Sequence, residues 1–331
     1  MPEAALSVHV QELSESWAPG RLRARLDPGV RLTVGPDLPD AADYDVLVAG
    51  RPTPSELAAS SSLKMLVIPW SGLPQSTRLA LLERPEIAVH NIHHNAAPAA
   101  EMAVALMLAA SKSIVPVDRS MRRDDWSPRY EPGRALLLEG RTAVVLGYGA
   151  IGRRIAAACR ALGMSVTALK RRPGDVEPGC PDRVLPPDAL HDVLPGAGVL
   201  QIALPHTDAT RGLIGERELS LLPSDSVVVN VARAPIVDEE ALFRALSEGS
   251  IRAAGLDVWY AYPKSEESRV STPPSRFPFR DLDNVVMSPH RAGAFAVREV
   301  EEARVDALAA TLNAAAAGGP VPHPVDVREG Y

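Results

Sequence analysis

Three glycines stand at Gly147, Gly149 and Gly152 with the spacing G-x-G-x-x-G. An apolar, strand-like stretch at 142–146 precedes them, and a stretch with helical spacing follows. In this setting the first glycine permits a tight turn, the second lets backbone approach a pyrophosphate, and the third lets helix and strand pack closely. Glycines also mark ordinary turns, so the flanking elements carry the prediction of a dinucleotide-binding loop. The loop residues predicted to contact the dinucleotide are Gly147, Tyr148, Gly149, Ala150, Ile151 and Gly152.

Three cations, Lys170, Arg171 and Arg172, follow the next predicted strand. A site for NAD normally presents an acidic residue to the ribose about 20 residues beyond the glycines, and Lys170 stands there instead. Cations at this point suit the 2'-phosphate of NADP through charge-assisted hydrogen bonds. The alternative is a solvated loop that happens to be basic. We therefore expect NADP(H) to be preferred, with NAD(H) as the alternative.

Three further segments carry a resemblance to a known family. They read NVARAPIVDEEAL at 230–242, AGLDV at 254–258 and MSPH at 287–290. In order and spacing they resemble the D-isomer-specific 2-hydroxyacid dehydrogenases, and the similarity extends over nearly the whole chain. The resemblance implies that the chain interconverts a 2-keto acid and a D-2-hydroxy acid. It also implies further cofactor contacts from Leu204, Pro205, Thr210, Val231, Ala232, Asp257 and His290.

The resemblance also assigns roles to two residues of these segments. Arg233 matches the residue that binds the substrate carboxylate and polarises the 2-keto group, for which a planar guanidinium is suited. His290 matches the acid/base, because an imidazole can both give and take a proton near neutral pH. The alternatives are a surface ion pair for Arg233 and a structural role for His290. Asp257 resembles an acidic residue near the nicotinamide, although a cap at a strand end is an alternative.

Two positions depart from the family pattern. The family has a glutamate just before a proline, where it orients the catalytic histidine, but Tyr262 precedes Pro263 here. A phenol cannot stabilise imidazolium as a carboxylate does, so we expect a lower pKa for His290 than in a glutamate-paired relative. Ser71 and Gly72 resemble the loop whose amides hold the substrate carboxylate, and Trp70 replaces a small residue there. The indole could reshape the pocket or pack beneath the loop.

The elements that must position these residues alternate between strand and helix. Strands are predicted at 6–10, 30–34, 45–49, 65–68 and 87–90, and then at 142–146, 165–169, 199–203, 226–230, 253–258 and 285–287. This pattern predicts an α/β protein with two Rossmann-like or flavodoxin-like, doubly wound parallel sheets. The resemblance implies that the cofactor domain, 99–292, is inserted in a discontinuous substrate-binding domain, 1–98 and 293–331. A buried helix over 99–113 is expected to connect them, followed by an irregular segment over 114–140.

Composition and charge bear on the partners, metal content and location to be expected. The chain has 331 residues, a net charge of −6 and basic residues spread along its length, so nucleic acid and membrane are not expected as partners. Two cysteines exclude a disulfide framework or a cysteine-rich metal site, and no metal is predicted. The first residues do not resemble a secretory signal, and we expect a cytoplasmic protein. The irregular segment and the resemblance together suggest a homodimer.

Two other functions stay open at this level. A cofactor-binding sensor or scaffold with little turnover is one, although the presence of both Arg233 and His290 argues against it. The other is a dehydrogenase of an atypical substrate, because Tyr262 and Trp70 replace residues usual in the family. The sequence does not name the acid.

Overall fold

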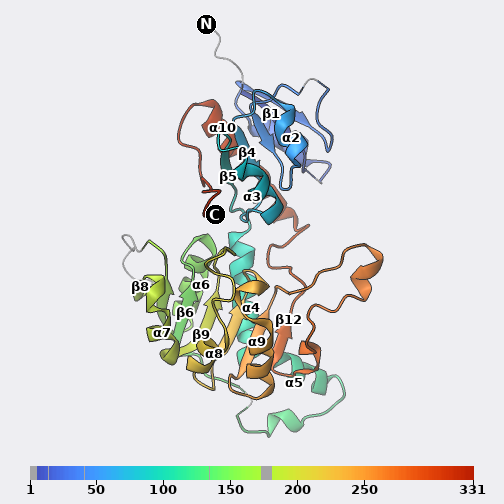
Figure 1. The fold of residues 1–331 in the computed structure, drawn as a ribbon. Helices are drawn as coiled ribbons and strands as arrows, with labels where there is room; N and C mark the ends of the chain where they lie inside the picture. The colour runs from blue at the N-terminus through green and yellow to red at the C-terminus, as the bar shows by residue number, and fades with distance from the viewer. Residues whose placement is uncertain (1–5, 14, 41, 134, 173–180) are drawn as a thin grey trace. The chain divides into compact units, whose positions relative to one another are not determined.

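The computed structural model describes residues 6–13, 15–40, 42–133, 135–172 and 181–331. They form two compact units, one made of Met1–Asn95 with Ala294–Tyr331 and the other of Ala96–Gly293 (Figure 1). Each unit contains one parallel sheet with helices on both faces. The predicted fold class, two doubly wound sheets with one unit inserted in the other, is confirmed.

The first unit has a five-stranded sheet in the order β2-β1-β3-β4-β5. Its strands are β1 (Leu6–Val10), β2 (Val30–Val34), β3 (Val46–Val48), β4 (Met65–Ile68) and β5 (Ala88–Asn91). Its helices are α1 (Ala18–Arg25), α2 (Pro54–Ala59), α3 (Gln75–Leu82) and α10 (Arg298–Ala316). Alternate strand residues face opposite layers: Val46 and Val48 pack with α1 and α10, whereas Leu47 packs with α2 and α3.

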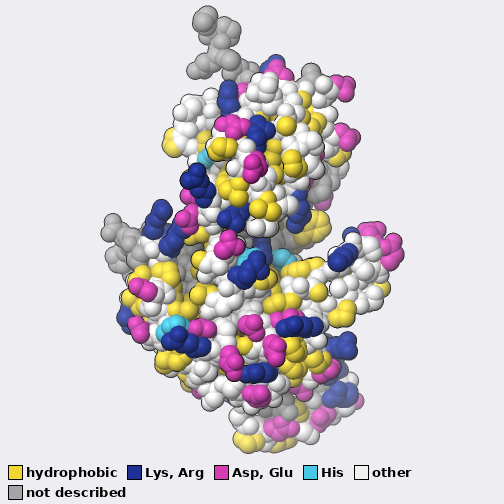
Figure 2. Space-filling view, viewed as in Figure 1, with side chains coloured by type: hydrophobic (Ala, Val, Ile, Leu, Met, Phe, Trp, Pro, Cys, Tyr) yellow, Lys and Arg dark blue, Asp and Glu magenta, His cyan; other side chains and the backbone are white. Residues whose placement is uncertain are grey.

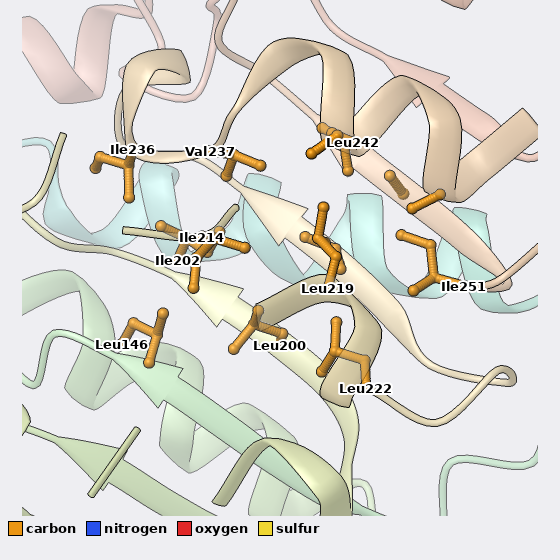
Figure 3. Packing of buried hydrophobic residues seen from close by; sticks show 14 of the residues in the cluster. Leu146, Leu200, Ile202, Ile214, Leu219, Leu222, Ile236, Val237, Leu242 and Ile251 are labelled. Carbon is orange, nitrogen blue, oxygen red and sulfur yellow. The ribbon is translucent and has the colours of Figure 1, made fainter. Parts of the chain in front are cut away.

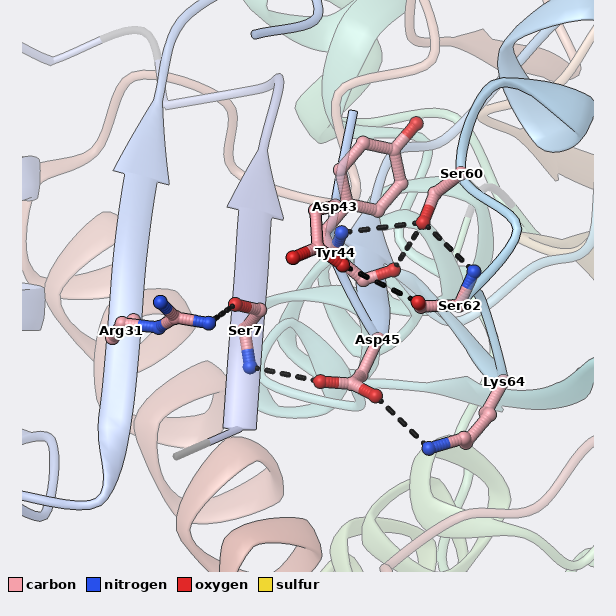
Figure 4. A network of polar contacts seen from close by, with 8 residues as sticks. All are labelled: Ser7, Arg31, Asp43, Tyr44, Asp45, Ser60, Ser62 and Lys64. Atoms are coloured by element: carbon pink, nitrogen blue, oxygen red, sulfur yellow. Dashed lines mark hydrogen bonds and ion pairs between the residues drawn. The ribbon is translucent and has the colours of Figure 1, made fainter. Parts of the chain in front are cut away.

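Polar contacts fix the strand β3 at its start (Figure 4). The Asp45 carboxylate accepts hydrogen bonds from the Ser7 amide at 3.1 Å and from the Lys64 ammonium at 3.0 Å. The buried Ser60 hydroxyl donates to the Tyr44 carbonyl at 2.8 Å. The side chains thus tie together β1, β3 and the segment that enters β4.

The second unit has a seven-stranded sheet in the order β12-β11-β10-β9-β6-β7-β8. Its strands are β6 (Thr142–Leu146), β7 (Ser165–Leu169), β8 (Arg183–Leu185), β9 (Ala197–Ile202), β10 (Val227–Asn230), β11 (Ala253–Leu256) and β12 (Val285–Met287). Its helices are α4 (Ala96–Ser111), α5 (Ile114–Met121), α6 (Ala150–Ala161), α7 (Leu190–Val193), α8 (Glu216–Leu221) and α9 (Glu239–Ser247). The chain reverses its direction of winding between β6 and β9, and ligands of open α/β sheets bind at such a point.

The central strands of this sheet are buried on both faces, which is why they read as continuous apolar runs. One face packs against α4 and α6, and the other against α7, α8 and α9. Figure 3 shows Leu146, Leu200 and Ile202 on the second face, close to Leu219 and Leu242. On α4, Leu106 lies so close to β11 that a Cβ added to Gly255 would be 2.7 Å from it.

Three details differ from the sequence prediction. α4 begins at Ala96, before Pro98, which a first helical turn tolerates because its N–H groups have no intrahelical partner. The segment expected to be irregular contains the helix α5. Ser113, the residue just before this helix, has a left-handed conformation with φ 52°. β8 is a seventh strand at the edge of the sheet, and only six had been predicted.

Two surface observations bear on partners. On the face drawn in Figure 2, Lys and Arg side chains are scattered among Asp and Glu rather than gathered into one field. Among the described residues, no single helix is long and apolar enough to cross a membrane; one bent pair, α4 with α5, passes by length and composition only. The buried face of α4 belongs to the core of the second unit.

Candidate active site

Strand register brings the predicted site residues of the second unit to one edge of its sheet. Pairing aligns one residue near the end of each of six neighbouring strands, in the order Leu169, Leu146, Ile202, Asn230, Leu256 and Met287. We call these six residues the edge row. The segments directly after them are Lys170–Arg172, Gly147–Gly152, Ala203–Pro205, Val231–Arg233, Asp257 and Ser288–His290. Residues from distant parts of the chain therefore share the carboxyl edge of the sheet.

The glycine loop has the geometry that a dinucleotide needs. Gly147 has a φ of +95°, and a Cβ there would lie 2.6 Å from the Ala203 carbonyl oxygen. A Cβ at Gly152 would lie 1.9 Å from the Gly147 carbonyl oxygen, so helix and turn touch at this point. Around Gly149, by contrast, no described atom beyond its chain neighbours lies within 4 Å of an added Cβ. A side chain would therefore clash with backbone at the first and third glycines, whereas the second glycine faces open space.

The start of α6 fits an anionic group. Gly149 is the N-cap of this helix, and no side chain of the described residues caps it. The first turn also carries no acidic residue. Uncapped N–H groups and the positive end of the helix dipole favour a phosphate. The loop from Gly147 to Gly152 therefore fits the diphosphate of a dinucleotide.

The three cations lie beside this loop. The Gly147 amide donates to the Leu169 carbonyl at 3.0 Å, so the turn adjoins the end of β7, where Lys170 follows. The Lys170 amide donates to the Leu185 carbonyl at 2.9 Å, which fixes its backbone between β7 and β8. Lys170 is half-buried, whereas Arg171 and Arg172 are exposed. The segment after them, 173–180, lies outside the described residues.

The loop on the other side of Gly147 is held by its own hydrogen bonds. The Thr210 hydroxyl donates to the Pro205 carbonyl at 2.7 Å and accepts from the Thr207 amide at 2.8 Å. These bonds fold 205–210 into a compact turn beyond β9. Leu204 and Pro205 are thereby kept next to the glycine loop, where the Leu204 amide nitrogen lies 3.1 Å from the Cβ position of Gly147.

Asn230 sets the backbone that carries Arg233. Its side chain donates to the Arg233 carbonyl at 3.1 Å and accepts from the Ala232 amide at 3.0 Å. Only 2% of Asn230 is exposed, whereas the Arg233 side chain is exposed and donates to the Ala232 carbonyl at 2.7 Å. Asn230 was not among the predicted site residues, although an asparagine at a strand end is a known turn former.

Asp257 anchors the loop that presents His290. The buried carboxylate accepts hydrogen bonds from the Ser288 hydroxyl at 2.5 Å and from the amides of Arg291 and Ala292 at 2.8 and 2.9 Å. The His290 amide donates to the Asp257 carbonyl at 2.7 Å. His290 itself has a φ of +57°, a left-handed conformation that is uncommon outside glycine. Asp257 thus holds a strained loop in place, and its suggested proximity to the nicotinamide stays a prediction.

Tyr262 and His290 form a hydrogen-bonded pair. The Tyr262 Oη lies 2.9 Å from His290 Nδ1, and it accepts a hydrogen bond from the Trp259 amide at 3.1 Å. The Trp259 indole in turn donates to the Ser288 carbonyl at 2.8 Å. Trp259 and Ser288 were not predicted as site residues, because their contacts depend on loop backbone. Nδ1 is engaged by this pairing, which leaves Nε2 for a substrate.

Desolvation and nearby charges shift the pKa values of this pair. The pKa of His290 is lowered, chiefly by desolvation of the ring and then by the charge of Arg233, while Asp257 acts in the opposite sense. The pKa of Tyr262 is raised by desolvation, which the Trp259 amide and Arg233 partly oppose. The pKa of His290 is thus lowered from the ordinary histidine value mainly by desolvation. The comparison with a glutamate-paired relative stays a prediction.

The loop predicted to bind substrate in the first unit follows β4. The Trp70 indole lies against Gly50, where an added Cβ would be 1.8 Å from the ring, and the Arg51 guanidinium stands 5.6 Å from the ring centre. The Asn91 side chain donates to the Ser71 carbonyl at 2.9 Å. Trp70 is half-buried and packs against the cluster that contains Leu47, Leu66 and Ile68. Its effect on a substrate pocket stays a prediction.

The described residues contain no group of three or more His, Cys, Asp or Glu side chains that could hold a metal ion. The groups on the carboxyl edge are a guanidinium, an imidazole with a phenol partner, and a glycine loop that fits a phosphate. This set can bind an anionic substrate, hold a dinucleotide and move a proton.

Comparison with known proteins identifies what this arrangement resembles. Residues 104–292 match the family model described as D-isomer specific 2-hydroxyacid dehydrogenase, NAD binding domain. The chain is 37% identical to the glyoxylate reductase of Aeropyrum pernix over 67% of this chain and 64% of that protein. It is 32% identical to the D-3-phosphoglycerate dehydrogenase of Mycobacterium tuberculosis over 98% of this chain and 60% of that protein.

The fold also has relatives among solved structures. A D-isomer specific 2-hydroxyacid dehydrogenase from Xanthobacter autotrophicus, in complex with NADPH and MES, matches with a TM-score of 0.79 and 24% identity, covering 99% of this chain and all of that one. At 24% identity this match shows that the fold is shared and nothing more. Against two further D-3-phosphoglycerate dehydrogenases, the chain spans only about half of their length, 43% and 46%.

Proposed function

Because the chain belongs to the D-isomer specific 2-hydroxyacid dehydrogenases, we propose that it interconverts a 2-keto acid and a D-2-hydroxy acid by hydride transfer with a nicotinamide cofactor. The observation that carries this proposal is the carboxyl edge of the second sheet. There the edge row brings the glycine loop, Arg233 and the His290–Tyr262 pair to the same edge, after β6, β10 and β12. The names of relatives such as glyoxylate reductase support the same reaction class.

Arg233 and His290 have different roles toward the substrate. Arg233 binds the carboxylate and the keto oxygen together, because its planar guanidinium presents several N–H donors in a fixed fork. His290 exchanges a proton with the same oxygen through Nε2, since Nδ1 is engaged by Tyr262. The loop Trp70–Gly72 contributes amides for the carboxylate. Asn230 and Asp257 act as positioning residues, because each fixes the backbone of a neighbour.

The cofactor is held by the loop and by the strand ends around it. A reduced nicotinamide, when bound, supplies the hydride that the keto carbon receives. We propose NADP(H) as the preferred form, with NAD(H) as the alternative, because Lys170, Arg171 and Arg172 adjoin the glycine loop. A structural relative bound to NADPH is consistent with this preference.

We also propose that 99–292 is the cofactor domain, that 1–98 with 293–331 binds substrate, and that the protein is a homodimer.

A direct test is the reduction of glyoxylate, pyruvate, hydroxypyruvate and phenylpyruvate by the purified protein with NADPH. His290→Asn should lower kcat about a hundredfold or more and change NADPH affinity only slightly, because most of the expected cofactor contacts remain. Asparagine is chosen because it tolerates the left-handed backbone of this position. His191→Asn is the matched control, since His191 contacts Glu218 on α8 and should leave kcat unchanged.

Four outcomes discriminate between the functions. Turnover of a 2-keto acid that His290→Asn abolishes supports the proposal. Tight NADPH binding without turnover of any of these acids favours a sensor or scaffold. Near-normal turnover by His290→Asn would show that another group is the acid/base. Activity restricted to other carbonyl or imine compounds favours an atypical substrate, for which Tyr262 is the motivating observation.

A further inference from the structure

A glutamate is expected at position 262 from the family pattern, and the tyrosine found there differs from it in one chemical respect. An ionised carboxylate only accepts hydrogen bonds, whereas a phenol also carries a proton to donate. A carboxylate next to Nδ1 therefore keeps the hydrogen of a neutral imidazole on Nδ1. A tyrosine allows the opposite arrangement, with its own proton directed at Nδ1.

The contacts around the Tyr262 hydroxyl favour that opposite arrangement. The Trp259 amide is a fixed donor, so at this contact Oη can act only as an acceptor. If the Tyr262 proton points to His290 Nδ1, the 2.9 Å contact between the two side chains is satisfied as well. If Nδ1 carried the hydrogen instead, Oη would accept two bonds and the Tyr262 proton would turn to solvent, which this 45% exposed side chain reaches. Only the first arrangement uses the proton in the contact between the two side chains.

We propose that Tyr262 holds neutral His290 in the tautomer with its hydrogen on Nε2 and is the proton reservoir of keto-acid reduction, an inference that rests on the proposed function. Tyr262 acts through His290 and is in this sense a positioning residue. Neutral His290 can then donate from Nε2 to the keto oxygen, so reduction does not require imidazolium.

The proton balance of the step can be followed atom by atom. As the keto carbon receives the hydride, the π pair of the carbonyl moves onto its oxygen. That oxygen takes the proton from Nε2 of His290, and Nδ1 takes the proton from Oη of Tyr262. Tyr262 is left as a phenolate, which the Trp259 amide donates to and which solvent water then reprotonates.

The groups around the pair fit this role. Arg233, after β10, lowers the pKa of both His290 and Tyr262, and Asp257, after β11, raises both. The net result is opposite for the two side chains, because desolvation lowers the pKa of His290 and raises that of Tyr262. Tyr262 thus stays protonated far above the pH at which His290 loses its charge. Reduction keeps its proton source through the neutral range, whereas oxidation needs the phenolate and is confined to alkaline pH.

The pH dependence of kcat/KM for keto-acid reduction tests this directly in the wild type, Tyr262→Phe and Tyr262→Glu. The wild type should stay level through neutral pH and decline only in the alkaline range. Tyr262→Phe should decline about tenfold for each pH unit above the pKa of His290, because only imidazolium can then give the proton. Tyr262→Glu should decline at a higher pH than Tyr262→Phe, because a carboxylate stabilises imidazolium.

Tyr260→Phe is the matched control. The Tyr260 hydroxyl donates to the Val237 carbonyl at 2.9 Å, so its loss should leave the pH profile unchanged. A solvent isotope experiment adds a second measure: rates in mixtures of H2O and D2O should indicate two transferred protons in the wild type and one in Tyr262→Phe.

A readout without turnover is the 15N NMR spectrum of histidine-labelled protein, recorded without cofactor above the pKa of His290. Wild-type His290 should carry its hydrogen on Nε2, and Tyr262→Glu should carry it on Nδ1. A wild-type hydrogen on Nδ1, or a wild-type pH profile that coincides with that of Tyr262→Phe, would overturn the inference while leaving the proposed function intact. If no keto acid is reduced at all, the proposed function fails, and the NMR result alone decides the tautomer.

Discussion

Asp257 has both carboxylate oxygens engaged by the loop from Ser288 to Ala292. A left-handed conformation at a residue other than glycine or asparagine costs on the order of 1 kcal/mol. Three hydrogen bonds to a buried, charged acceptor offset that cost and leave His290 with a fixed backbone. His290 is one of six described residues other than glycine with a positive φ, and proteins commonly retain such strain at functional side chains.

At the residue scale, the proposed preference for NADP(H) depends on Arg171 and Arg172, together with Lys170. Replacing both by alanine should weaken NADPH binding by about ten- to a hundredfold, the size of one or two charge-assisted hydrogen bonds, and leave NADH binding nearly unchanged. Fluorescence titration of each cofactor measures this. Arg217→Ala, an exposed arginine on α8, is the control. An equal loss for both cofactors, or no loss, would mean that the 2'-phosphate is not bound here.

At the scale of elements, two glycines of the turn between β6 and α6 have different expected roles. Replacing one should reduce stability and binding, and replacing the other should reduce binding alone. Gly152→Ala would place a Cβ 1.9 Å from the Gly147 carbonyl oxygen, so turn and helix must move apart. This variant should lose about 1–3 kcal/mol of unfolding free energy together with cofactor affinity. Gly149→Ala meets no described atom within 4 Å and should keep its thermal midpoint, yet it should bind NADPH more weakly, because the Cβ takes up space needed by the diphosphate.

Thermal unfolding without cofactor and NADPH titration distinguish the two variants. Gly196→Ala, at another glycine where an added Cβ has open space, is the control for both measurements. Wild-type NADPH affinity in Gly149→Ala would contradict the binding of a diphosphate at this loop.

The strands that bury both faces were predictable, because runs such as Val227–Asn230 are apolar and β-branched. β8 and α5 were not. β8 has three residues at a sheet edge, too few for a pattern, and α5 carries Pro116 within a segment of mixed polarity. Arg233 and His290 could be named from motifs. The contacts of Asn230 and Trp259 could not, because they depend on where loop backbone turns.

At the scale of the whole molecule, exposed apolar side chains gather in one stretch of the second unit. Large apolar residues left exposed there are Ile114, Val115, Met121, Trp126, Tyr130 and Leu137. Trp126 is 58% exposed and Tyr130 77%, and large aromatic side chains are enriched at protein interfaces. This supports the proposal that the segment contributes to a homodimer.

Light scattering at micromolar concentration should therefore give the mass of two chains. Ile114→Glu combined with Trp126→Glu should shift the mass toward one chain, because charges would be buried at the interface. Leu79→Glu, at an exposed leucine of α3 in the first unit, is the control and should leave the mass unchanged. A wild-type mass of one chain would refute the dimer.

The first unit is discontinuous, and this affects the order in which a newly made chain can fold. One face of its sheet is covered in part by Val305, Leu308 and Leu312 of α10. A ribosome adding about 5–20 residues per second needs roughly 10–40 s to go from the end of β5 to that helix. The second unit, continuous in sequence, can complete its core during this interval. The sheet that emerges first is thus the last to be covered, and its apolar face is what a nascent-chain chaperone would meet.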